Sequence, residues 1–292
     1  MQFDEILRII ITGLLLGGLY ALIAMGLNLQ YGVARVFNVA HGEFIMLAAI
    51  STYALYYFAN INPFIAIIIS APLALILGYL IHVLIFRRML RTSPNQAAFE
   101  GNSMLASFGL LFIIQNIATV LVPWRSGIRS YSFLSQPFDI GGILVATNRL
   151  VALGFAIAIG LAFYFFLSYT RVGKAIRAAA QDPATAGLMG ININRVLALC
   201  FGIGAALAAI AGVLISMVYP VHVNMGLQYT VIAIIVVVLG GLGSIPGAFI
   251  GGLMLGVIGS IVSYFQPELT LATYYLLIIL LLLARPKGLF GK

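Results

Sequence analysis

Residues 229–264, YTVIAIIVVVLGGLGSIPGAFIGGLMLGVIGSIVSY, form an apolar run of 36 residues that carries no formal charge. A continuous helix of this length would rise roughly 54 Å, whereas the hydrocarbon core of a bilayer is only about 30 Å thick. The middle of the run holds the residues that break helices most strongly, Gly240, Gly241, Gly243, Pro246 and Gly247. The pattern therefore predicts two shorter helices joined by a turn, as either a re-entrant hairpin or two tilted spans.

The composition places the rest of the chain in a membrane as well. Of the 292 residues, 63% are hydrophobic and 8% are charged, whereas a soluble domain carries about 25% charged residues. The apolar runs are continuous rather than alternating, which excludes a β-barrel. Because lipid requires every backbone amide to pair internally, helices are the expected structure. We expect an all-α, polytopic helical membrane protein.

The other apolar runs have the length of membrane spans, which need about 20 residues. They lie near residues 9–29, 43–59, 63–86, 104–123, 149–169, 196–219 and 270–284. Together with the broken segment they predict about eight transmembrane helices. No linker or change in composition divides the chain, so residues 1–292 are expected to form a single transmembrane domain.

Basic residues indicate which loops face the cytoplasm. They cluster at Arg87, Arg88 and Arg91, at Arg171, Lys174 and Arg177, and at Arg285, Lys287 and Lys292. The positive-inside rule places all three groups in the cytoplasm if segment 229–264 enters the membrane and returns. The N-terminus and loop 124–149 then lie outside, although Arg125, Arg129 and Arg149 conflict with that assignment. In a membrane protein, a net charge of +8 reflects basic cytoplasmic loops. No nucleic-acid partner is therefore expected.

The stretch RVGKAIRAAAQDPATAGLMG, residues 171–190, is polar and rich in alanine. Residues 170–181 are predicted to continue the preceding span as a helix that leaves the membrane. A second short helix is then predicted, because its boundary residues are typical of helix caps: Asp182 as the N-cap, Pro183 as the first residue and Gly190 as the left-handed stop. Small residues give this helix a nearly bare surface: Ala184, Ala186, Gly187 and Leu188. It either fits a groove on a cytoplasmic partner or merely shields its own loop.

Polar residues at membrane depth are the candidates for a translocation path or gate. Asn38, His41 and Glu43 fall within six residues at the start of a span, where ionisable groups usually face a cavity or a partner. The alternative is an interfacial helix start, with Glu43 complementing the helix dipole. Gln115 and Asn116 lie within another span, where they either bond to a neighbouring helix or line the path. Neither a second His nor a Cys accompanies His41 at metal-site spacing, so no metal is expected.

Small residues recur every four positions in three of the runs. The ridges are Gly13, Gly17 and Ala21; Ala208 and Gly212; and Gly252, Gly256 and Ser260. Such ridges allow helices to pack closely in lipid, and they also suit helices that slide past one another.

The sequence contains neither a phosphate-binding G-x-x-x-x-G-K-[ST] loop nor a catalytic signature. Any energy for pumping must therefore come from a partner, and we expect a non-catalytic chain that binds no cofactor of its own.

Six segments resemble the permease subunits of branched-chain amino acid ABC importers. They are YALIAMG (20–26), FNVAHGE (37–43), GKAIRA (173–178), AGLMGI (186–191), LGGLGSIPGA (239–248) and RPKGLFG (285–291). The segments follow the same order from the first span to the C-terminus, which makes the resemblance specific at the level of the family.

The resemblance implies a membrane subunit of an ATP-driven machine in the cytoplasmic membrane of a bacterium or archaeon. Its expected partners are a second related permease, two cytoplasmic ATPases that bind ATP and Mg, and an extracytoplasmic substrate-binding protein. Within a cytoplasmic loop at about 171–195, the family's coupling helix falls on residues 182–190. The coupling helix of such permeases docks into a groove on an ATPase.

The resemblance implies branched-chain amino acids, leucine, isoleucine and valine, as the substrates. Residues 229–238 depart from several relatives in carrying no charge, and a more apolar path would suit these substrates. A urea or short-amide permease of the same wider family is the alternative. A self-contained secondary transporter or channel is a rival of a different class. It would need intramembrane charges for coupling ions, and residues 196–267 contain none.

Overall fold

The computed structural model describes residues 3–122, 127–140, 143–285 and 288–291. Its α-helices are α1 (Phe3–Ala34), α2 (His41–Ala59), α3 (Pro63–Ile81), α4 (Arg87–Thr92), α5 (Gln96–Leu121), α6 (Thr147–Tyr169), α7 (Arg171–Gln181), α8 (Pro183–Leu188), α9 (Ile193–Ser216), α10 (Met225–Gly240), α11 (Ile245–Phe265) and α12 (Thr270–Ala284). A π-helical turn, His82–Phe86, joins α3 to α4, and a 3-10 turn, Pro267–Leu269, precedes α12. Three of the basic residues used to orient the chain, Arg125, Lys287 and Lys292, lie outside the described residues.

Eight helical segments of the described chain are long and apolar enough to cross a membrane. They comprise α1, α2, α3 continued by α4, α5, α6, α9, α11, and the 3-10 turn continued by α12. The predicted helical class and number of spans are confirmed, so the chain is a multi-pass membrane protein. The hairpin of β1 (Pro137–Ile140) and β2 (Ile143–Ala146), in the loop before α6, was not predicted.

Helix α9 is the centre of the bundle, packed against α1, α2 and α3. Over the most apolar 18 consecutive residues of α9, 78% are buried inside the protein, compared with 6% for the segment Pro267–Ala284, which contains α12. The buried face of α9 is rich in alanine and glycine, which lets the neighbouring backbones approach closely. Helices α3, α5 and α12 instead expose most of their apolar side chains, as expected for surfaces that meet lipid or another membrane subunit.

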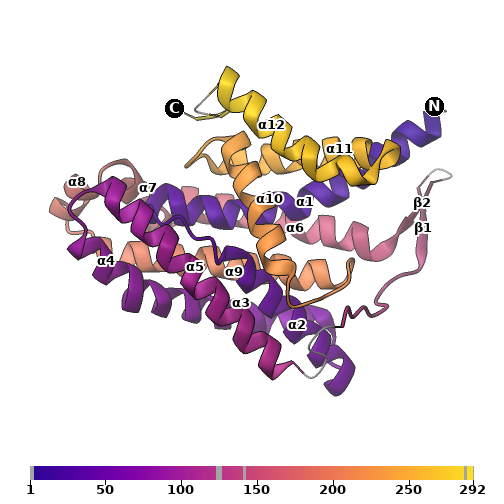
Figure 1. The fold of residues 1–292 in the computed structure, drawn as a ribbon, viewed down its shortest axis with the longest axis horizontal. Helices are drawn as coiled ribbons and strands as arrows, with labels where there is room; N and C mark the ends of the chain where they lie inside the picture. The colour runs from indigo at the N-terminus through magenta and orange to yellow at the C-terminus, as the bar shows by residue number, and fades with distance from the viewer. Residues whose placement is uncertain (1–2, 123–126, 141–142, 286–287, 292) are drawn as a thin grey trace.

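The two ends of the bundle differ in character. Figure 1 shows α4, α7 and α8 at one end, and the N-terminus with the β1–β2 hairpin at the other. Helices α4 and α7 carry two of the three basic clusters. The arrangement agrees with the predicted cytoplasmic placement of these clusters, and the side of the membrane remains a prediction.

The predicted glycine ridges of the first and eleventh helices pack against each other. A Cβ atom on Gly13 would lie 2.6 Å from the Cα of Val257, and one on Gly17 would lie 2.7 Å from the Cα of Leu253. Only glycine permits this approach of the α1 and α11 backbones. The prediction that the ridges mediate tight packing is confirmed.

Segment 229–264 is broken where its glycines and proline predict. Helix α10 ends at Gly240, and α11 begins at Ile245 with Ser244 as its N-cap, whose Oγ accepts a hydrogen bond from Gly247 N at 3.1 Å. Gly241 and Gly243 have φ angles of 98° and 84°, in the left-handed region that favours glycine. In Figure 1, α10 crosses the direction of α1 steeply, whereas α11 runs along it.

The sequence prediction for the segment that follows α6 is wrong. Residues 170–181 do not continue the preceding span, because α6 ends at Tyr169 and Thr170 has an extended ψ of 156°. The Thr170 hydroxyl accepts a hydrogen bond from Gly173 N at 2.9 Å and so caps a new helix, α7. The basic helix is therefore a separate element that can be set at its own angle to the membrane.

Candidate functional site

A buried polar network lies at the corner between α1 and α2. Gln30 Oε1 accepts a hydrogen bond from Asn38 Nδ2 at 3.0 Å and lies 3.2 Å from His41 Nδ1. Gln30 Nε2 donates to the carbonyl of Phe201 in α9 at 3.0 Å. The other ring nitrogen of His41 lies 3.1 Å from the carbonyl oxygen of Ile23. The network ties this corner to the central helix, as buried amides in lipid require partners.

Glu43 lies beside this network, in the first turn of α2. Its side chain is 0% exposed, and neither carboxylate oxygen has a hydrogen-bond partner among the described residues. It packs against Gly226 in the first turn of α10, where even an added methyl group would overlap the carboxylate. The positive ends of two helix dipoles, those of α2 and α10, therefore meet at this carboxylate.

Thr230 joins the same corner to α10. Its hydroxyl accepts a hydrogen bond from Gly42 N at 2.7 Å and donates to the carbonyl of Val39 at 3.0 Å. The structure thus brings together three of the predicted path residues, Asn38, His41 and Glu43, and adds Gln30 and Thr230. Sequence reasoning missed these two because single polar residues in long apolar runs carry no motif.

The other two predicted path residues lie elsewhere. Gln115, in α5, donates to Asn224 Oδ1 at 2.9 Å, at the residue that precedes α10. Asn116 is exposed and donates to the carbonyl of Phe112, one turn earlier in its own helix. Gln115 therefore bonds to the residue that begins a neighbouring helix, which agrees with one of its two predicted roles, whereas no bond from Asn116 to another helix is found among the described residues.

The short helix α8 forms the tip of the end opposite the hairpin (Figure 1). Asp182 is its N-cap and accepts hydrogen bonds from Ala184 N at 2.9 Å and Thr185 N at 3.2 Å. Hydrogen bonds from the Thr185 side chain and these amides lower the pKa of Asp182. Gly190, with a φ of 84°, follows the helix as predicted.

The surface of α8 is prominent and apolar. Leu188 is 88% exposed and the following Met189 is 80% exposed. Of the α8 residues only Ala186 is buried, and it holds the helix against the start of α9. The sequence predicted a nearly bare surface for this helix. In the structure, the large apolar side chains of Leu188 and Met189 project from it.

Two cavities open at the two ends of α1. The outer cavity, of about 710 Å³, lies at the end that carries the hairpin and is lined by Arg8, Thr12, Arg149, Tyr219, Tyr229 and Tyr274, among others. The inner cavity, of about 620 Å³, is lined by Tyr31, Arg35, Arg177, Gly243 and Ser244, among others. The two share no lining residue, and the middle of α1 between them is buried.

This buried middle part of α1 is called the waist, and its residue Asn28 contacts two residues that line the inner cavity. Its Nδ2 donates to the carbonyl of Ser244 at 2.7 Å, and its Oδ1 accepts from Gly243 N at 2.6 Å. One side chain of α1 therefore holds the turn between α10 and α11. Sequence reasoning located the turn but not this residue.

The fold and these features define a class of protein, a multi-pass helical permease with an exposed apolar helix at one end and a cavity at each end of one span. The chain belongs to the family described as the permease component of branched-chain amino acid transport systems, whose model matches residues 9–284.

Individual relatives agree with this assignment. The chain is 33% identical to the high-affinity branched-chain amino acid transport system permease protein LivH of Salmonella typhimurium, over 100% of this chain and 97% of the relative. It is 31% identical to BraD of Pseudomonas aeruginosa, over 98% and 96%. Among solved structures, PsaBC from Streptococcus pneumoniae in complex with a Fab is similar with a TM-score of 0.47 and 17% identity, over 91% of this chain and 89% of that chain.

Proposed function

We propose that this chain is the membrane-spanning permease subunit of an ATP-driven importer in the cytoplasmic membrane, and that it forms the path for leucine, isoleucine and valine. The observation that carries the proposal is the family match over almost the whole chain, from residue 9 to residue 284. The apolar helix α8, exposed beside the basic clusters, supports it, because a permease without its own nucleotide site must contact the subunits that hydrolyse ATP.

The machine then contains partners that supply what this chain does not. Two cytoplasmic subunits bind ATP and Mg, a second related permease completes the path, and an extracytoplasmic binding protein delivers the amino acid. The coupling helix at residues 182–190, with Leu188 and Met189 at its tip, docks into a groove on one ATPase. The permease binds no cofactor and catalyses no reaction in this scheme.

Movement of α8 reaches the transport path through α9. Asn192 caps α9 directly after the docking helix, with its Oδ1 accepting from Arg195 N at 3.1 Å. Further along α9, the Phe201 carbonyl holds Gln30 and, through it, Asn38 and His41. In the proposal this corner and the buried Glu43 act as the gate, because Thr230 links them to α10. The path then opens alternately toward the outer and inner cavities.

The substrate assignment is tested by uptake in cells that produce the chain with the ATPases, second permease and binding protein encoded beside it. Radiolabelled leucine uptake is measured with and without an excess of unlabelled valine, isoleucine, urea or acetamide. Valine and isoleucine are expected to compete, and urea and acetamide are not. Competition by urea or acetamide with no effect of valine would replace the amino acid by the alternative substrate class.

A further inference from the structure

The outer cavity gathers polar groups that the packing of the helices does not require. Five tyrosines line it, Tyr20, Tyr219, Tyr229, Tyr264 and Tyr274, and they come from α1, α10, α11, α12 and the loop after α9. Its volume of about 710 Å³ falls within the range of about 300–1,000 Å³ typical of small-molecule sites.

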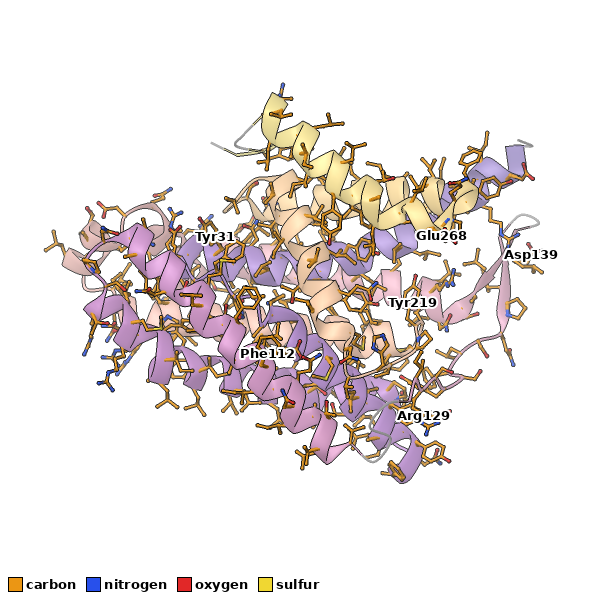
Figure 2. The ribbon with its side chains drawn as sticks, viewed as in Figure 1. Tyr31, Phe112, Arg129, Asp139, Tyr219 and Glu268 are labelled. Carbon is orange, nitrogen blue, oxygen red and sulfur yellow. The ribbon has the colours of Figure 1, made fainter. Side chains whose placement is uncertain are left out.

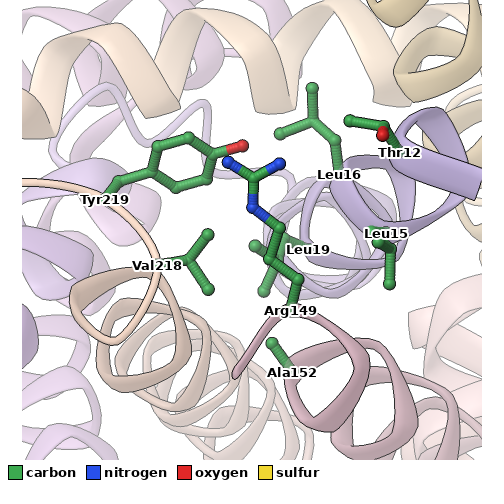
Figure 3. Close-up of a pocket in the computed structure, with 8 residues that line it drawn as sticks. All are labelled: Thr12, Leu15, Leu16, Leu19, Arg149, Ala152, Val218 and Tyr219. Atoms are coloured by element: carbon green, nitrogen blue, oxygen red, sulfur yellow. The ribbon is translucent and has the colours of Figure 1, made fainter. Parts of the chain in front are cut away.

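Arg149, in the first turn of α6, is one of three charged residues that line this cavity, together with Arg8 and Glu5 of α1. Figure 3 shows the Arg149 guanidinium group directed toward the Tyr219 hydroxyl and Leu16, away from its own helix. This guanidinium interacts electrostatically with Tyr219, and no hydrogen bond or ion pair is found for it within the described part of the chain. Arg149 was one of the basic residues that conflicted with an outside assignment of its loop. Because it lines a cavity, its charge need not indicate that the loop faces the cytoplasm.

One hydroxyl group of the same cavity lacks a partner. Thr270 Oγ1 is buried and forms no hydrogen bond with the described residues. Tyr274 is 1% exposed, and its ring meets that of Tyr20 edge to face at 6.4 Å between centroids. Buried hydroxyls without partners are uncommon and indicate a ligand or water that completes their hydrogen bonds. Apolar side chains complete the wall, among them Ile9, Leu16 and Ile232.

These groups match the three parts of a free amino acid with an apolar side chain. A guanidinium binds a carboxylate through paired N–H donors. Tyrosine faces attract an ammonium group, and hydroxyl groups of the cavity wall accept its hydrogen bonds. The aliphatic wall suits a branched hydrocarbon side chain.

We propose that the outer cavity is a receiving site for the free amino acid, in which Arg149 binds the α-carboxylate. The inference rests on the proposed function and adds to it the place of first contact within this chain. Tyr219 lies beside the carboxylate-binding group, and Thr270 and Tyr274 belong to the wall of the same cavity. The amino acid enters this site from the extracytoplasmic side before the waist of α1 opens.

A cysteine-protection experiment tests the site without relying on transport. The only cysteine of the chain, Cys200, is 0% exposed, so the native chain gives a low labelling background. Ser263→Cys places a thiol at an exposed position on the cavity wall. The assembled complex, without binding protein, is labelled with a neutral maleimide in the presence of leucine or of leucinol, which lacks the carboxylate. Leucine is expected to slow labelling, and leucinol is not.

Arg149→Gln in the Ser263→Cys chain is expected to be labelled at the unprotected rate with or without leucine, with the apparent affinity for leucine reduced about tenfold or more. Arg129→Gln is the matched control, because Arg129 is an exposed arginine of the same loop region whose backbone, not its side chain, pairs with Val221. Equal protection by leucinol, or full protection of the Arg149→Gln chain, would overturn the inference. If the native complex takes up leucine with ATP but shows no protection, only the receiving site is wrong; if it takes up none, the proposed function is wrong.

Discussion

Single amide side chains hold the elements of this bundle in register. Asn28 is 1% exposed and makes two hydrogen bonds to the turn between α10 and α11, while Gln30, two residues later, bonds to α9. In lipid no water replaces these bonds, so each amide fixes one contact between elements far apart in the sequence. Figure 2 shows that most of the side chains along the ribbon consist almost entirely of carbon.

Asn28→Ala is expected to lower the free energy of unfolding by about 1–3 kcal/mol, because it leaves Gly243 N and Ser244 O without their partner. Asn116→Ala is the control and is expected to change stability by less than about 0.5 kcal/mol, since Asn116 is exposed and bonds only within its own helix. Unfolding of the purified chain in mixed micelles measures both. Equal stability of the two variants would contradict the role given to Asn28.

At the scale of elements, the contact between α1 and α11 depends on glycine. Gly17→Leu is expected to separate the two helices and destabilise the chain by about 1–3 kcal/mol or more, because a Cβ already lies 2.7 Å from the Leu253 Cα. Gly154→Leu in α6 is the matched control, since nothing lies within 4 Å of its Cβ position. Thermal unfolding of both variants in the same detergent makes the comparison, and an equal loss of stability would show that the ridges are not the cause.

Elements whose signals are local were predictable from the sequence. The break at residues 240–247 follows from glycine and proline, and the start of α8 follows from Asp182 and Pro183, because caps act on their own helix. Thr170 was not recognised as a cap, since a threonine between two helix-forming runs is equally compatible with a continuous helix. The hairpin before α6 was also missed in a chain assigned to helices.

The candidate site was only partly predictable, because its residues meet through tertiary packing. The motif FNVAHGE located Asn38, His41 and Glu43, but nothing in it indicates that Glu43 is fully buried against α10. The outer cavity draws its tyrosines from several separate elements. Arg149 carried one usable signal, a positive charge in a loop assigned to the outside.

For the whole molecule, the proposed transport scheme treats the two cavities and the packed waist between them as one closed state of a path. Helix α8 lies at one end of the bundle and the cavity that Arg149 lines at the other, and α9 passes through the core between these regions. Coupled transport then requires that force applied at α8 changes access at the opposite end. A chain that works alone would not need an exposed apolar tip on α8.

ATP-dependent leucine uptake into proteoliposomes tests this claim most directly. The complete complex is reconstituted with the native chain, with Leu188→Glu, or with the control Ala97→Glu, which adds the same charge at an exposed position on α5. We predict uptake that requires ATP in the native and control complexes, and a loss of roughly tenfold or more for Leu188→Glu, because an unpaired carboxylate must enter the apolar groove of the ATPase. Uptake by this chain alone without ATP, or native uptake by the Leu188→Glu complex, would contradict the account.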